Sequence, residues 1–504
     1  MNNQQIKKGA IISYVAIIIS IVAGLFYTPW MISQIGKADY GLYMLMISVL
    51  TFFVIDYGLS QSVTRLLAKY RVEGDTAKID NLLGLTAKLY LILDVLVIIA
   101  LIVFYFFIDD LFIKLSFVEI IKFKQIYLIA AIFSVMSFPL LYISGIYYAF
   151  ELFLQVKLFD LVSKLGSVFL TIVILLLGYG LTYLVLVYAT TPFLINIGKV
   201  LYLKRKKYLN INWEFWNNDV LKGILSTSVW LLIILIGEVF LKNISPTLLG
   251  KFSGTEEIAI FAIANGLDHY IISVAAALNG LFLPRISFYL NQNNKEKLFE
   301  NLMVKVGRFQ ILIIGFITIA LILVGKDFIL IWVGANFANS YYVLILLIIP
   351  TFLFSIIQIG TTYILAMNEL KYQAYAFVLA AISNIIFSFI LIPKFGAIGS
   401  GISIFLSKFI FYIAGFTFIF YKKFNIDMRF FYRNTFVPII IPVILIVSSF
   451  LIFDYCTLPQ KNIFSFVVNC LVLSFIFSTV VYLLYLKDNE KKLILNYLQK
   501  ILGI

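Results

Sequence analysis

Charged and titratable residues within or at the ends of long apolar stretches are the first candidates for function, because placing an ionisable group in such a stretch costs free energy. The basic candidates are Arg65, Lys69, Arg285, Lys408 and Lys199, and the other candidates are Asp56, Asp268 and His269. Lysine and arginine side chains bind phosphate groups through charge-assisted hydrogen bonds. We therefore predict that the basic residues contact an anionic substrate and that the other three act in ion coupling or gating. No residue is predicted to be catalytic.

Asp56 lies near the middle of the apolar run from 41 to 64. An acidic group at that depth costs at least ~2.5 kcal/mol if it faces lipid, so we expect its side chain to face protein or water. In a helix Arg65 would lie about half a turn out of phase with Asp56 and about 13.5 Å away along the axis, so the two cannot form a local salt bridge. Three interpretations remain open for Asp56: a structural hydrogen bond or helix cap, an ion- or proton-coupled switch, and direct contact with a sugar.

The cations at the ends of apolar runs admit two interpretations. Arg65 and Lys69 end one run, and Arg285 ends a later run in the matching place, so they could bring positive charge to both sides of one cytoplasmic entrance. Alternatively, the same three residues anchor the helices in the membrane, with the charged end of each side chain at the lipid headgroups and its aliphatic part in the bilayer.

The remaining candidates lie inside the runs. Asp268 and His269 are neighbours, which suits either a proton relay or ordinary polar contacts. Lys199 lies near the cytoplasmic end of its run and could reach the interface, whereas Lys408, about a dozen residues into its run, is the better candidate for a cavity.

The elements that must position these residues are membrane-spanning helices. Hydrophobic residues make up 62% of the 504 residues and charged residues only 13%, far from the composition of a soluble domain. At about 36 residues per span and connection, the chain would hold about fourteen spans. The predicted spans are 10–32, 41–64, 84–107, 125–148, 160–178, 181–202, 223–243, 257–283, 306–324, 341–366, 374–392, 397–421, 437–453 and 462–486. The fold class is thus an all-α integral membrane protein.

The charge distribution predicts the orientation of these spans. Most lysines and arginines in the connections fall on the side that holds the N-terminus, which predicts that both termini are cytoplasmic. The first span follows a short polar start and lacks a small-residue cleavage site, so we expect a retained helix and not a signal peptide. The net charge of +14 is explained by these topology signals, which also contact anionic lipid. No nucleic-acid partner is predicted.

An internal similarity predicts two halves. Residues 35–79 and 252–298 share an order of features, namely glycine and an acid, an apolar span, then arginine and a polar amphipathic stretch. Each lies at the second span of a possible six-span half, and an even number of spans makes the halves parallel repeats. The predicted parts are an N-terminal lobe (1–203), a cytoplasmic linker (204–222), a C-terminal lobe (223–424) and two appended spans with a tail (425–504).

The sequence offers little for a metal, a cofactor or a disulfide. It has two cysteines at no useful spacing and one histidine, without a CxxC, HExxH or phosphate-loop motif. We therefore expect no cofactor and no metal, although coupling to protons, sodium or the membrane potential stays open.

Several segments resemble a known family. The stretch GKADYGLYMLMISVLTFFVIDYGLSQSVTRLLAKY (36–70) resembles the second-span signature of the polysaccharide transporters, the Wzx-type O-antigen flippases of the multidrug/oligosaccharidyl-lipid/polysaccharide (MOP) exporter superfamily. Residues 366–407 are similar to spans 10 to 12 of that superfamily, with Asn384 inside a helix and Pro393 and Gly396 at its end. LFLPRISF (281–288) also fits.

The resemblance implies a transporter and not an enzyme. It implies two helical lobes around a cavity, and movement of an undecaprenyl-diphosphate-linked oligosaccharide to the outer leaflet of the bacterial inner membrane for O-antigen, lipopolysaccharide or capsule assembly. The expected partners are that lipid-linked glycan, bilayer lipid and the polysaccharide polymerase machinery. The related lipid II flippases carry several arginines in their first two spans, whereas the first span here has none, which argues against a peptidoglycan precursor.

The sequence leaves two other functions open. One is a drug or metabolite cation antiporter of the same superfamily, whose cavity should centre on acidic residues. The other is a membrane polysaccharide polymerase or glycosyltransferase, which usually needs a sizeable outer loop with catalytic carboxylates. The longest outer connection, 108–124, offers only Asp109, Asp110 and Glu119.

Overall fold

The computed structural model describes residues 3–54, 56, 58–279, 282–456, 463–488 and 490–491, and in these residues the chain is helical without a β-strand. It divides into two compact units, one formed by residues 1–266 and 370–407 and the other by residues 267–369 and 408–504. Each unit is described by itself. The predicted lobes 1–203 and 223–424 stay a prediction, and the predicted tail beyond residue 491 lies outside the described residues.

The first unit holds α1 (Asn3–Ile35), α2 (Lys37–Phe53), α3 (Leu59–Glu73), α4 (Thr76–Leu111), α5 (Phe117–Ser137), α6 (Ile143–Ala149), α7 (Phe153–Leu176), α8 (Leu181–Arg205), α9 (Asn218–Phe252), the first half of α10 (Thr255–Asn279) and α16 (Leu370–Ser407). The second unit holds the rest of α10, α11 (Leu283–Leu290), α12 (Lys295–Gln310), α13 (Phe316–Val333), α14 (Ser340–Ile357), α15 (Ile359–Ala366), α17 (Gly415–Phe424), α18 (Met428–Thr435), α19 (Val437–Cys456) and α20 (Ile463–Val480). Three π-helical segments, Ile311–Gly315, Lys408–Ala414 and Val481–Tyr485, interrupt the second unit.

Within the described residues, twelve helical segments are long and apolar enough to cross a membrane. The predicted all-helical membrane fold is therefore confirmed, and the count of fourteen is approximate for two reasons. The predicted spans 374–392 and 397–421 are counted together in the candidate Leu370–Phe424, which the non-helical residue Gly396 divides into two helices. The predicted span 41–64 is wrong as a single helix, because α2 ends at Phe53 and α3 begins at Leu59.

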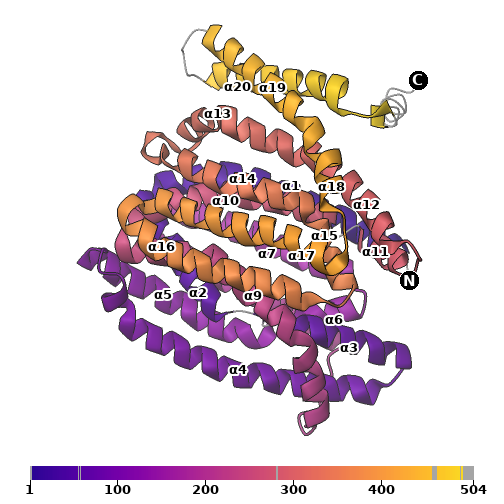
Figure 1. The fold of residues 1–504 in the computed structure, drawn as a ribbon. Helices are drawn as coiled ribbons and strands as arrows, with labels where there is room; N and C mark the ends of the chain where they lie inside the picture. Colours follow the sequence, from indigo (N-terminus) through magenta and orange to yellow (C-terminus); the bar gives the residue numbers. More distant parts are fainter. Residues whose placement is uncertain are drawn as a thin grey trace. The chain divides into compact units, whose positions relative to one another are not determined.

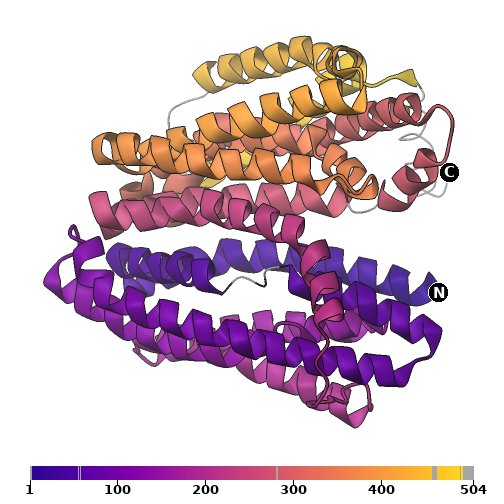
Figure 2. The same cartoon turned by 60° about the horizontal axis from the view of Figure 1, so that its bottom comes forward.

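The break between α2 and α3 has a local cause. Gly58 adopts a left-handed conformation with φ of 66°, which glycine reaches at little cost and which cannot continue a right-handed helix. A Cβ atom at this position would also lie 3.2 Å from Cβ of Leu231 on α9. Figure 2 shows α2 and α3 as separate helices joined by a short non-helical stretch.

Helices α9 and α16 lie side by side in the first unit (Figure 1) and pack closely through a glycine. A Cβ atom on Gly237 of α9 would lie 2.9 Å from the carbonyl carbon of Phe377 on α16, so only glycine permits this approach. In the same interface the buried amide of Asn384 donates to the carbonyl oxygen of Leu241 at 3.2 Å. This contact satisfies a polar group that would otherwise be costly at this depth.

Helix α16 bends at Gly396, whose φ of 54° lies in the left-handed region. The N–H of Ala397, freed by the bend, donates to the Glu257 carboxylate of α10 at 2.7 Å. The bend divides α16 into two helices between the predicted spans 374–392 and 397–421.

The last two spans, α19 and α20, lie side by side in the second unit (Figure 1). Arg308 of α12 is 3% exposed and ties the end of this pair to the unit. Its guanidinium donates to the Tyr485 carbonyl oxygen at 2.6 Å and to the Glu490 carboxylate at 2.8 Å, and it lies 4.2 Å from the centre of the Tyr485 ring. These contacts fix the C-terminal end of the pair against α12.

Candidate functional site

A cavity of about 500 Å³ lies in the first unit, among α1, α2, α7 and α8. Three of these helices, α1, α7 and α8, are long and apolar enough to span a membrane. The lining residues are Tyr27, Tyr43, Asp160, Ser163, Lys164, Ser167, Val168, Thr171, Tyr188, Pro192, Ile195, Asn196 and Lys199. Most of them are polar, which is unusual for the interior of a membrane bundle and marks a candidate site for a polar ligand.

Lys199 of α8 is buried in the wall of this cavity and forms an ion pair. Its Nζ lies 2.8 Å from Oδ1 of Asp160 on α7, and only 7% of the lysine side chain is exposed against 46% of the aspartate. The alternative in which Lys199 reaches the lipid interface is therefore wrong, because the carboxylate holds its ammonium group inside. The half-exposed carboxylate stays accessible from the cavity.

Lys164 provides a second cation on the same wall. It follows Asp160 by one helical turn on α7 and lines the cavity, and within the described residues its ammonium group forms no hydrogen bond or ion pair. The cavity thus holds two lysines and one aspartate, with one lysine available to an anionic ligand. Sequence analysis missed Asp160 and Lys164, although an acid and a base spaced four residues apart in a span were a usable signal.

Tyrosines complete the cavity. The rings of Tyr43 on α2 and Tyr188 on α8 meet edge to face with centroids 5.5 Å apart, and Tyr27 of α1 lies beside them in the lining. A tyrosine offers an apolar face with a hydroxyl at its tip, which suits contact with the mixed surface of a sugar.

The second unit contains another buried lysine–aspartate pair. Nζ of Lys408 lies 3.5 Å from Oδ2 of Asp268 and donates to Oγ1 of Thr351 at 2.9 Å. Asp268 is 2% exposed, and its Oδ1 has no hydrogen-bond partner among the described residues. Lys408 also begins a π-helical segment, a type of irregularity that is frequent at functional sites.

The structure therefore brings two predicted site residues together and separates two others. Asp268 and Lys408, which are 140 residues apart in sequence, face each other. Asp268 and His269 do not share surroundings, because Asp268 is buried and His269 is exposed on the same helix.

Asp56 lies at the start of α3, where its carboxylate accepts hydrogen bonds from the hydroxyls of Tyr90 on α4 and Ser60 on α3. Its carbonyl oxygen accepts from the N–H of Leu59 at 3.1 Å. Of the three interpretations, these contacts match the structural hydrogen bond, and the N-cap position of α3 is held by Gly58. A role of Asp56 in coupling or sugar contact stays a prediction.

The three cations predicted for a cytoplasmic entrance are exposed. Arg65 and Lys69 lie on α3, where Lys69 is 3.9 Å from the Glu73 carboxylate, and the Nε–H of Arg285 on α11 donates to the Tyr289 hydroxyl at 2.7 Å. Their shared role at one entrance stays a prediction.

Two acids of the predicted outer connection, Glu119 and Asp109, have structural partners, whereas Asp110 is exposed. Glu119 forms a capping box with Ser116 at the start of α5 and accepts a hydrogen bond from the Thr255 hydroxyl at 2.5 Å, and Asp109 pairs with Lys124.

The described residues hold no cluster of three or more metal-binding side chains. Cys470 is a free thiol, and the side chain of Cys456 lies outside the described residues, so the expected lack of a disulfide stays a prediction.

The family model described as "Polysaccharide biosynthesis protein" matches residues 6–290, more than half of the chain. The chain belongs to this family. No curated protein matches the sequence significantly. Among solved structures, the lipid II flippase MurJ in an inward closed conformation has a TM-score of 0.69 at 14% identity, with 94% of this chain and 99% of that chain covered.

Multidrug transporters share the fold as well. An inward-facing multidrug resistance MATE family transporter of the MOP superfamily has a TM-score of 0.60 at 16% identity. The similarity covers 81% of this chain and 97% of that transporter's chain. A MATE transporter of Vibrio cholerae has a TM-score of 0.57 at 13% identity, with 82% and 96% covered. The family match agrees with the predicted resemblance to the polysaccharide transporters, and the solved structures show that the chain has the fold of the MurJ flippase and of the MATE transporters.

Proposed function

We propose that this protein is a flippase that moves undecaprenyl-diphosphate-linked oligosaccharide units from the cytoplasmic to the outer leaflet of the bacterial inner membrane by alternating access. Family membership and the MOP-type fold support transport of a polysaccharide precursor. The observation that carries the proposal is the cavity among α1, α2, α7 and α8, whose lining includes Lys164, Lys199 and three tyrosines.

The cavity suits a sugar diphosphate by charge and by shape. Lys164 donates to phosphate oxygens, and the tyrosine faces contact sugar rings. An anion that enters also competes with Asp160 for Lys199, whose pairing distance is 2.8 Å. Because Asp160 is nearly half exposed, its carboxylate regains water when the lysine turns to the ligand, and the exchange costs little. A volume of about 500 Å³ holds a headgroup, and the polyprenyl chain stays in lipid.

No covalent step is needed. Residues act by binding the cargo differently in the inward- and outward-open states. With both termini cytoplasmic, as the lysine and arginine distribution predicts, the membrane potential favours outward movement of two uncompensated negative charges by ~4.6 kcal/mol per 100 mV.

The sealed pair of Asp268 and Lys408 is the proposed coupling element. Its carboxylate has one oxygen without a partner, which can take a proton or contact a small cation such as sodium when the surroundings rearrange. Because the pair lies in a different compact unit from the cavity, this role is separable from substrate binding by mutation.

Two other functions fit the family and fold less well. A drug or metabolite cation antiporter, which the MATE-like fold brings to mind, needs an acidic cavity, whereas this cavity has two lysines and one aspartate. A polymerase or glycosyltransferase needs several free carboxylates at the outer face, whereas Glu119 and Asp109 are engaged in a helix cap and an ion pair and leave only Asp110 of the predicted outer connection.

The test is leaflet-resolved labelling of undecaprenyl-linked glycans in cells that lack the protein, with variants restored. Lys164→Ala should slow the appearance of glycan in the outer leaflet about 10- to 100-fold, because losing a charge-assisted hydrogen bond costs about 1.5–3 kcal/mol. Lys164→Arg should retain most activity. Lys157→Ala, on the same helix but outside the cavity lining, is the matched control and should behave as wild type. If the glycans reach the outer leaflet normally without the protein, the flippase assignment is wrong.

A further inference from the structure

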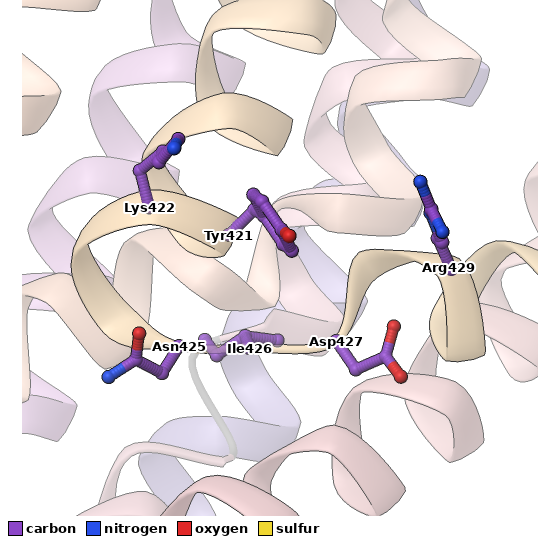
Figure 3. Close-up of a pocket in the computed structure, with 6 residues that line it drawn as sticks. All are labelled: Tyr421, Lys422, Asn425, Ile426, Asp427 and Arg429. Atoms are coloured by element: carbon purple, nitrogen blue, oxygen red, sulfur yellow. The ribbon is translucent and has the colours of Figure 1, made fainter.

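A second cavity lies in the second unit, at the turn that joins α17 to α18. It has a volume of about 520 Å³ and is lined by Tyr421, Lys422, Asn425, Ile426, Asp427 and Arg429. Figure 3 shows Lys422 and Arg429 on opposite sides of this cavity with the Tyr421 ring between them. The cavity is distinct from the site in the first unit and has no part in the function proposed above.

The turn that forms this cavity is firmly built. Asn425 ends α17 in the left-handed conformation with φ of 50°, and the buried side chain of Ile426 anchors the turn. Asp427 caps α18, since its Oδ1 accepts from the N–H of Phe430 at 2.9 Å, and its own N–H donates to the Glu300 carboxylate at 2.6 Å. The cavity wall is therefore held in place without a ligand.

The charges at the cavity are unbalanced in favour of an anion. Within the described residues neither Lys422 nor Arg429 forms a hydrogen bond or an ion pair. The one acid of the lining, Asp427, is already used by the helix cap. Two cations across a hollow, with a tyrosine hydroxyl between them, can bind a phosphate group from both sides.

The position of the cavity indicates where that phosphate comes from. Helix α18 is amphipathic, with Met428 and Phe431 buried and Arg429 and Arg433 exposed. It leads directly into α19, which carries exposed Ile440 and lies with α18 in the candidate membrane span Met428–Tyr455. A basic amphipathic helix beside a spanning helix lies at the headgroup level of the membrane.

We propose that this cavity binds the phosphate headgroup of one anionic phospholipid through Lys422 and Arg429. The site holds the lipid at the connection between α17 and the appended helices α19 and α20. A bound lipid bridges α17 and α18, so it stabilises the native state by mass action.

The experiment uses the purified full-length protein in nanodiscs of phosphatidylcholine with or without phosphatidylglycerol. Native mass spectrometry counts retained phosphatidylglycerol, and thermal unfolding measures the stabilisation. Wild type should retain one anionic lipid and unfold several degrees higher with phosphatidylglycerol. Lys422→Gln with Arg429→Gln should lose both effects. Arg433→Gln, which removes an exposed charge from the same helix outside the cavity, is the matched control and should keep both.

Three outcomes would overturn the proposal. If Arg433→Gln loses the lipid as fully as the double variant, the lipid is held by the general positive charge of the surface and not by this cavity. If glycerol phosphate in solution protects the protein equally in phosphatidylcholine alone, the ligand is a soluble phosphate compound. If the double variant retains the lipid, the cavity does not bind it. Because transport is not measured, these results do not depend on the proposed flippase activity.

Discussion

Asp268→Asn tests whether the buried pair of Asp268 and Lys408 is a true ion pair. Asp268 is 2% exposed and Lys408 is 8% exposed, so both groups are removed from water. Removing one partner of such a pair leaves an uncompensated buried charge and costs about 3–5 kcal/mol. Lys408 keeps its hydrogen bond to Thr351 at 2.9 Å, so we expect a loss of about 3 kcal/mol, at the lower end of that range.

Replacing both partners should cost much less. Asp268→Asn with Lys408→Met removes the charge as well as its partner, and apolar replacement of buried pairs is often neutral. The double variant should therefore recover to within about 1 kcal/mol of wild type, which gives a coupling energy of about 2 kcal/mol or more between the two sites.

The assay is unfolding of the purified protein by sodium dodecyl sulfate in mixed micelles, followed by tryptophan fluorescence. Asp488→Asn, an exposed acid of the same unit, is the control and should change the free energy of unfolding by no more than about 0.5 kcal/mol. A loss below about 1 kcal/mol for Asp268→Asn, or strictly additive losses in the double variant, would refute the buried ion pair.

Two further predictions concern other contacts. Tyr90→Phe removes a hydroxyl that donates to the Asp56 carboxylate. This variant should lower the free energy of unfolding by about 1–3 kcal/mol in the same assay. An unchanged free energy would show that the contact does not hold the break between α2 and α3. Burial raises the pKa of Glu490, but the hydrogen bonds from Arg308 and from the N–H of Lys487, together with the positive charges of these two residues, outweigh burial, so the pKa lies below its ordinary value of 4.5. The contact between Arg308 and Glu490 therefore stabilises the folded protein fully at pH values above the pKa of Glu490 in the unfolded chain. This stabilisation is lost as the pH falls through the lower pKa of Glu490 in the folded protein. Amide exchange in residues 486–491 should rise as pH is lowered below about 4.5, beyond the intrinsic change in exchange rate, and should stay flat in Glu490→Gln.

The spans could be predicted because a helix that crosses the lipid bilayer must be long and apolar, and a hydropathy profile detects such segments directly. The break at Gly58 could not be predicted, because its apolar run continues on both sides and the close approach of Leu231 on α9 arises only from helix packing. The bend at Gly396 was placed at the right residue as an end of a helix. What hydropathy could not show is that the Glu257 carboxylate of α10 binds the N–H of Ala397 that the bend leaves free.

The candidate sites were predicted residue by residue but not as assemblies. Lys199 and Lys408 were both identified from their depth in apolar runs. Their partners depend on helix packing, because Asp160 lies on α7 and Asp268 on α10. A single sequence carries no signal that pairs residues 140 positions apart, so Lys408 and Asp268 were assigned separate roles.

The two lysine–aspartate pairs differ in a way that bears on mechanism. In the first unit the aspartate is 46% exposed beside an open cavity, so an incoming phosphate can replace it on Lys199 while the carboxylate returns to water. In the second unit the aspartate side chain is 3% exposed, and releasing Lys408 would leave a bare charge in the interior. That pair can separate only if Asp268 is neutralised by a proton or a small cation at the same time. The cavity pair therefore suits exchange with cargo and the sealed pair suits coupling to an ion, so Asp160→Asn should alter glycan binding and Asp268→Asn the dependence of transport on the ion gradient.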